Sequence, residues 1–96
     1  MPMIKSFKNK ETEKIFGMER STKLPQSIQR VATRKLWMID AATTINDLRI
    51  PPANHLEQLK GNKQGLHSIR INDQWRICLM WRESNAYEVE IIDYHK

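Results

Sequence analysis

The sequence predicts an α+β fold in which one strand and two to three helices precede an antiparallel meander of three strands. Helical patterns occupy the first half of the chain, and three strand patterns separated by short turns follow residue 65. Helices grouped before a run of strands pack on one face of the sheet, so the expected order is β-α-α-β-β-β. No linker or repeat interrupts the chain, which we interpret as one domain over residues 1–96.

The N-terminal part predicts one strand and one short helix. Ile4 to Phe7 alternates apolar and polar side chains, which indicates an opening strand. Asn9 is a suitable N-cap for a helix that runs to about Phe16, and acidic residues in the first turn complement the helix dipole. Gly17 ends this helix.

A longer helix should begin at Pro25, because proline is tolerated in a first helical turn. It ends near Ala42, and Lys35 lies at the edge of its apolar stripe. The segment from Thr44 to Asp47 resembles a capping box with Asp in place of Glu, which starts one further turn. Two prolines, Pro51-Pro52, stop that turn.

Burial determines the register of the first two meander strands. The three strands are expected at about residues 66–71, 75–81 and 87–93. A three-residue turn over 72–74 pairs Ile69 with Ile77, whereas a slip of one residue would mix the apolar face with the polar one. The same register places Arg70 opposite Arg76 on the other face, which we expect to be open. Facing arginines repel, and an anion bound there would offset the repulsion.

Charge and composition narrow the class of protein. Residues 1–65 carry twelve Lys/Arg against six Asp/Glu, whereas residues 66–96 carry four against five. A basic surface favours RNA, DNA or acidic proteins, but an unspecialised solvated surface explains the charge equally well. The sequence has no signal-peptide pattern and no membrane-length apolar run, and its lone Cys78 suggests a buried thiol. We therefore expect a cytoplasmic protein with no membrane partner.

The polar residues suggest metal-independent phosphoryl transfer. Zinc-type His or Cys spacing, phosphate-binding glycine loops and a nucleophile elbow are absent from the sequence, so we expect neither a metal nor a cofactor. RNA cleavage then requires proton transfer at the 2′-hydroxyl and the leaving oxygen, with cations at the phosphate. The candidates for proton transfer are Glu57, Asp93, Tyr94 and His95. The candidate cations are Arg76, with Arg70 and Lys60 as RNA-binding supports.

Each candidate also has a purely structural interpretation. Asp93 would pair with an arginine of the sheet, and Tyr94 would cover the edge of the core or stack on a base. His95 would be a frayed terminal residue, because chain ends are poorly ordered unless docked. Lys60 would be a solvated loop lysine. The residue types alone leave these alternatives open.

Three blocks of the sequence match a known family. They are PPANHLEQLKG over residues 51–61, HSIRINDQWRI over 67–77 and the closing Asp93-Tyr94-His95, and the opening Ile4–Phe7 segment fits as well. Over nearly its entire length the chain resembles the HigB toxins of bacterial toxin–antitoxin pairs, within the RelE/ParE superfamily.

The resemblance implies a compact RelE-like fold and cleavage of mRNA on the translating ribosome without a metal. It also implies neutralisation by a HigA-like helix-turn-helix antitoxin. The toxin would then contact operator DNA only indirectly, through this antitoxin. By position, Arg76 matches the family's active-site arginine, Lys60 its basic loop residue, and residues 93–95 its catalytic C-terminal cluster. Glu57 stands where some relatives have a histidine.

Two other functions fit the same fold. A ParE-like protein would poison DNA gyrase without cutting RNA, although the Asp93–His95 end argues for a nuclease. A non-catalytic module would only bind the antitoxin and tune its contact with DNA. Gyrase inhibition would identify the first alternative, and loss of toxicity in the absence of the antitoxin would identify the second.

Overall fold

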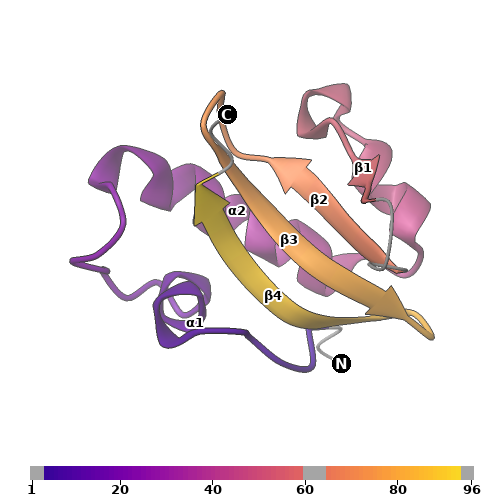
Figure 1. Ribbon diagram of the computed structural model, residues 1–96, viewed down its shortest axis with the longest axis horizontal. Coiled ribbons are helices and arrows are strands. Elements are labelled where there is room, and N and C mark those ends of the chain that lie inside the picture. The colour runs from indigo at the N-terminus through magenta and orange to yellow at the C-terminus, as the bar shows by residue number, and fades with distance from the viewer. Residues whose placement is uncertain (1–3, 60–64, 94–96) are drawn as a thin grey trace.

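The computed structural model describes residues 4–59 and 65–93, which form a layer of helices against a sheet (Figure 1). The helices of this part are α1 (Lys10–Phe16), α2 (Gln26–Ala41) and the short 3-10 helices η1 (Ile45–Arg49) and η2 (Pro52–Asn54). The strands are β1 (Glu57–Gln58), β2 (Leu66–Arg70), β3 (Trp75–Arg82) and β4 (Asn85–Asp93). They form an antiparallel sheet in the order β1-β2-β3-β4, which confirms the α+β prediction.

The helices begin and end where their capping residues predict. Asn9 caps α1 because its Oδ1 accepts the backbone N–H of Thr12 at 2.9 Å. At the other end, the N–H of Gly17 bonds back to the last turn. The capping box of Thr44 and Asp47 starts η1 as predicted. None of the helices in the described ranges is long and apolar enough to cross a bilayer.

The predicted opening strand is reduced to two separate contacts. Ile4 and Phe7 each make an isolated parallel bridge with β4 instead of a continuous ladder. A bulge in β4 explains the interruption, because Glu88 has a φ of +51° and the β3–β4 register shifts beside it. Ser6 fits this bulge, and its Oγ accepts the Glu88 N–H at 2.8 Å. The N-terminal segment therefore joins the sheet only at its edge.

The predicted register between β2 and β3 is confirmed. Ile69 pairs with Ile77 and Arg70 pairs with Arg76. The turn between the strands is held by Asn72, whose Oδ1 accepts the backbone N–H groups of Gln74 and Trp75. Apolar side chains of β2 and β3 thus share the face that the helices cover.

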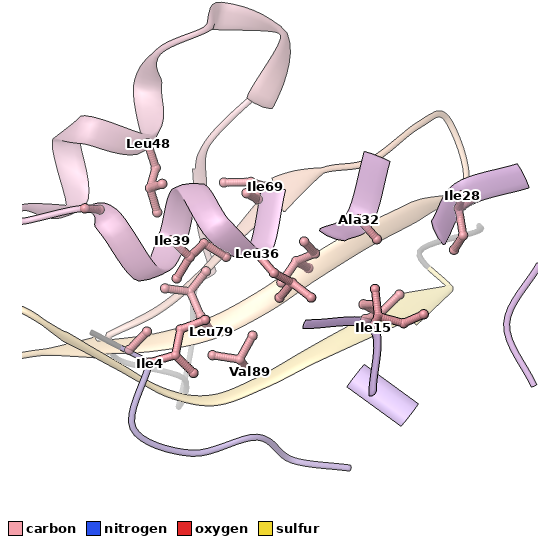
Figure 2. Packing of buried hydrophobic residues seen from close by; sticks show 14 residues of the cluster. Ile4, Ile15, Ile28, Ala32, Leu36, Ile39, Leu48, Ile69, Leu79 and Val89 are labelled. Carbon is pink, nitrogen blue, oxygen red and sulfur yellow. The ribbon is translucent and has the colours of Figure 1, made fainter. Parts of the chain in front are cut away.

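The core lies between this sheet face and α2 (Figure 2). Its fully buried apolar side chains come from both helices, η1 and all three long strands. They include Ile15, Leu36, Ile39, Leu48, Ile69, Ile77, Leu79 and Val89. The core also connects distant parts of the chain through a polar contact, since the Thr12 hydroxyl of α1 accepts the backbone N–H of Ile91 in β4 at 3.0 Å.

Candidate functional site

Arg76 lies on the sheet face opposite the helices, but that face is not open at this position. The residue is only 6% exposed, so the expectation of an open arginine face was wrong here. Its Nε donates to Ser68 Oγ at 2.9 Å, and its Nη2 donates to the carbonyl of His55 at 2.6 Å. The guanidinium also lies 3.9 Å from a carboxylate oxygen of Glu57. These contacts hold a permanent positive charge in one orientation.

The segment over residues 55–58 provides part of this cover. Strand β1 pairs with the free edge of β2, with Glu57 opposite Ser68. Directly opposed residues of an antiparallel pair point to the same face, so the Glu57 side chain lies on the side of Arg76. His55 turns the chain toward this pairing with a left-handed backbone, at a φ of +45°. The sequence did not predict β1, which has only two residues.

A buried polar pair supports the segment that holds Arg76. Asn54 is fully buried, and its Nδ2 donates to the carbonyls of Leu48 at 3.1 Å and Ile50 at 3.4 Å. Lys35 of α2 donates from Nζ to Asn54 Oδ1. Because His55 follows Asn54 directly, this pair places the carbonyl that accepts Arg76.

Lys35 is a residue near the site that sequence reasoning placed incorrectly. We expected it at the edge of the apolar stripe, whereas it is 7% exposed. Burial lowers the pKa of Lys35 below its ordinary value of 10.5, and the nearby charges of Arg34 and Arg70 lower it further. The sequence held one signal of this burial, since Lys35 is in the helical phase of the buried apolar residues of α2. Lysine is almost never buried without a partner, so this position called for a buried polar partner.

Arg70 faces Arg76 across the register, and each arginine has its own carboxylate. Arg70 forms an ion pair with Asp73 in the adjoining turn, while Glu57 lies beside Arg76. The repulsion that suggested an external anion is therefore offset within the protein. Arg70 remains partly exposed, with a side-chain exposure of 33%, and borders the buried guanidinium.

The C-terminal candidates are only partly within the described residues. Asp93 ends β4 opposite Trp75, so it leaves the sheet on the helix side and not on the side of Arg76. Its carboxylate accepts Gln74 Nε2 at 3.1 Å and is exposed. Tyr94, His95 and Lys60 lie outside the described residues. Over the ranges 4–59 and 65–93, no group of three or more His, Cys, Asp or Glu is placed to hold a metal ion.

This architecture, with helices packed on one side of an antiparallel sheet, is the α+β fold of a RelE-like toxin. Residues 5–95 match the family described as the RelE-like toxin of type II toxin–antitoxin system HigB. The chain belongs to this HigB-like toxin family, and membership implies an antitoxin as its partner.

Several curated relatives support the family assignment. Toxin HigB-1 of Vibrio cholerae is 40% identical over 95 residues, covering 98% of this chain and 99% of the relative. Endoribonuclease HigB of Proteus vulgaris is 36% identical over 94 residues, covering 97% and 100% of the two chains. An uncharacterised protein of Haemophilus influenzae is 47% identical over 75 residues, covering 77% and 72%.

Proposed function

We propose that this chain is the toxin of a toxin–antitoxin pair and a metal-independent endoribonuclease that cuts mRNA on the translating ribosome. It acts in the cytoplasm as one domain, and a HigA-like helix-turn-helix antitoxin neutralises it and carries it to operator DNA. Family membership and the Proteus vulgaris relative named Endoribonuclease HigB support this function. The arrangement of Arg76 and Glu57 provides the physical argument.

The observation that carries the proposal is the anchored guanidinium of Arg76. Its hydrogen bonds to Ser68 and His55 are formed before any substrate binds. A charge held in advance by the fold stabilises a developing negative charge without reorganising during the reaction. The Glu57 side chain lies 3.9 Å from the guanidinium and is 51% exposed, so it is both close to Arg76 and accessible to solvent. The pair thus joins a fixed cation to a solvent-accessible base.

The reaction follows from these roles. The 2′-oxygen of one nucleotide bonds to the adjacent phosphorus while the bond from phosphorus to the 5′-oxygen breaks. Glu57 accepts the 2′-hydroxyl proton, and Arg76 stabilises the charge on the phosphorus oxygens. We assign the proton for the leaving 5′-oxygen to Tyr94 or His95 rather than to Asp93, because Asp93 leaves the sheet on the side opposite Arg76. The products are a 2′,3′-cyclic phosphate and a 5′-hydroxyl, and Arg70 and Lys60 bind the RNA backbone.

The test is cleavage of a defined mRNA in a purified translation system. Wild-type toxin should produce cut mRNA with 2′,3′-cyclic phosphate ends, and a variant with both Arg76→Ala and His95→Ala should leave the mRNA intact. Arg49→Ala, which changes an exposed arginine of η1, is the matched control and should cut normally. Intact mRNA at doses that arrest growth would reject the nuclease, and inhibition of gyrase supercoiling at those doses would support the ParE-like alternative.

A further inference from the structure

An open groove of about 650 Å³ lies on the helix layer, between the end of α1, the loop that follows it and the outer side of α2. Met18 and Trp37 line this groove and are 72% and 46% exposed. Within the described ranges, three large apolar side chains are exposed, and only the third, Ile50, lies elsewhere. Grouped exposed apolar side chains indicate a binding surface more than scattered ones do.

The groove is also basic. Arg20, Arg30 and Arg34 line it, against the single acidic side chain of Glu19. Methionine, tryptophan and arginine are the residue types enriched in protein–protein interfaces. A ligand that complements this lining carries negative charge and at least one apolar side chain.

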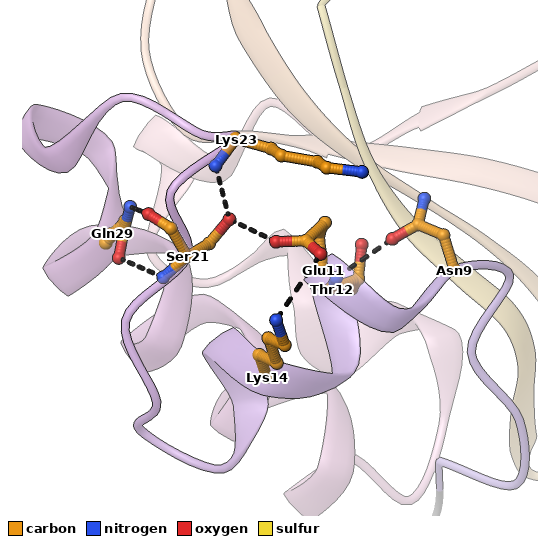
Figure 3. Close-up of polar contacts among 7 residues, drawn as sticks. All are labelled: Asn9, Glu11, Thr12, Lys14, Ser21, Lys23 and Gln29. Atoms are coloured by element: carbon orange, nitrogen blue, oxygen red, sulfur yellow. Dashed lines mark hydrogen bonds and ion pairs between the residues drawn. The ribbon is translucent and has the colours of Figure 1, made fainter.

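The loop that forms one wall is held in place before any ligand binds. Ser21 is 1% exposed, and it exchanges two hydrogen bonds with the Gln29 side chain of α2, at 3.2 and 2.9 Å (Figure 3). The hydroxyl of Ser21 also bonds to Glu11 of α1. Across the groove, Trp37 Nε1 donates to the Phe16 carbonyl at 3.2 Å. A preformed surface binds a partner with less loss of conformational entropy.

The backbone conformation of Met18 costs folding stability, although the side chain at this position is exposed and apolar. It has a left-handed backbone with a φ of +66°, a conformation in which methionine is strained and glycine is not. Gly17 is the immediate neighbour, yet the exposed apolar residue occupies the strained position. Strain at an exposed apolar side chain motivates a hypothesis of binding.

We propose that this groove binds an acidic segment of the antitoxin, with an apolar side chain of that segment packed against Met18 and Trp37. The arginines pair with its carboxylates. The proposal rests on the antitoxin partner of the proposed function and is independent of the ribonuclease chemistry. An RNA occupant is disfavoured because the two exposed apolar side chains, Met18 and Trp37, match a protein partner.

The experiment measures the Kd of the toxin for the antitoxin encoded beside the toxin gene. Two groove variants are used, Met18→Gly and Arg34→Glu, and each should weaken binding about tenfold or more, as expected for hot-spot residues. Met18→Gly should do so without lowering Tm, because glycine relieves the backbone strain at this position. The matched controls are Ile50→Ser and Arg49→Glu, which change an exposed apolar residue and an exposed arginine outside the groove. They should change Kd by less than about twofold.

Two further measurements make the result decisive. Binding of a single-stranded 20-nucleotide RNA and mRNA cleavage should be the same in the groove variants as in the wild type. If both groove variants bind the antitoxin like the controls, the proposal is wrong, and it is also wrong if they lose only RNA binding. If the wild type cuts no mRNA while the groove variants still lose the antitoxin, the nuclease proposal fails and this one stands.

Discussion

Two arginine-bearing regions on opposite sides of the fold differ in how their charges are held. Arg76 is buried and held by Ser68 and a backbone carbonyl, with a carboxylate 3.9 Å away. The arginines of the groove stand at the surface around exposed apolar side chains. A buried, anchored cation suits a transition state whose negative charge develops at one fixed position. Surface arginines suit a protein partner that brings its own carboxylates. The two regions therefore share a residue type and differ in burial, and the two proposed roles follow from that difference.

The largest expected effect tests the buried region. Arg76→Ala should reduce the rate of mRNA cleavage roughly 100- to 1,000-fold, the range for losing one preorganised donor. Arg76→Lys should not restore it, because an ammonium cannot reproduce the fork that bonds Ser68 and His55 together. Initial cleavage rates provide the measurement, with thermal unfolding to confirm that the variants are folded. Equal rates for wild type and Arg76→Lys would show that only charge matters, which would weaken the comparison.

The next effect concerns the pair that supports Arg76. Asn54→Ala leaves Lys35 and the buried Leu48 carbonyl without their partner and removes the bond to the part-buried Ile50 carbonyl, which should lower the free energy of unfolding by about 1–3 kcal/mol. Urea titration measures this loss, and Asn46→Ala, at an exposed site in η1, is the control. At a temperature where the variant is folded, kcat for cleavage should fall more than KM rises, because the His55 carbonyl shifts. An unchanged kcat would show that cleavage does not depend on the Lys35–Asn54 pair.

Lys35 gives the same region a pH dependence. Because burial lowers its pKa in the folded state, the unfolded chain binds more protons between that lowered pKa and 10.5. Wild-type stability should therefore rise relative to Lys35→Met as pH increases through this window, and the difference should be constant at lower pH. Urea unfolding at pH 7 and pH 10 measures it. A difference that shrinks with rising pH would show that Lys35 is stabilised as a cation.

The smallest effect lies outside both regions. Asn9→Ala removes the N-cap of α1 and should cost about 1 kcal/mol of stability, seen as a lower urea midpoint. Cleavage and antitoxin affinity should stay within about twofold of the wild type, as for changes away from a site. Asn9→Asp, which keeps an acceptor for the helix N–H, should recover the midpoint. A loss of antitoxin affinity in Asn9→Ala would mean that the groove depends on the position of α1.

The sequence by itself determined the parts of this protein that depend on local chemistry. The cap at Asn9, the box at Thr44 and the pairing of Ile69 with Ile77 follow from a few neighbouring residues and from the period of apolar side chains. The family resemblance likewise proposed Arg76 as the active-site arginine before its surroundings were known, and that role stays a prediction. Tyr94, His95 and Lys60 stay predictions, because they lie outside the described residues.

Only the tertiary structure decided which charges are buried. Asn54 meets Lys35 from a position 19 residues away, and the His55 carbonyl reaches Arg76 across 21 residues. The groove likewise forms where a loop after α1 packs against the middle of α2. Periodicity tells which side a residue faces, but the segment that covers that side comes from a distant part of the chain. Burial, and with it the difference between an anchored and a surface arginine, is therefore a property of the folded chain.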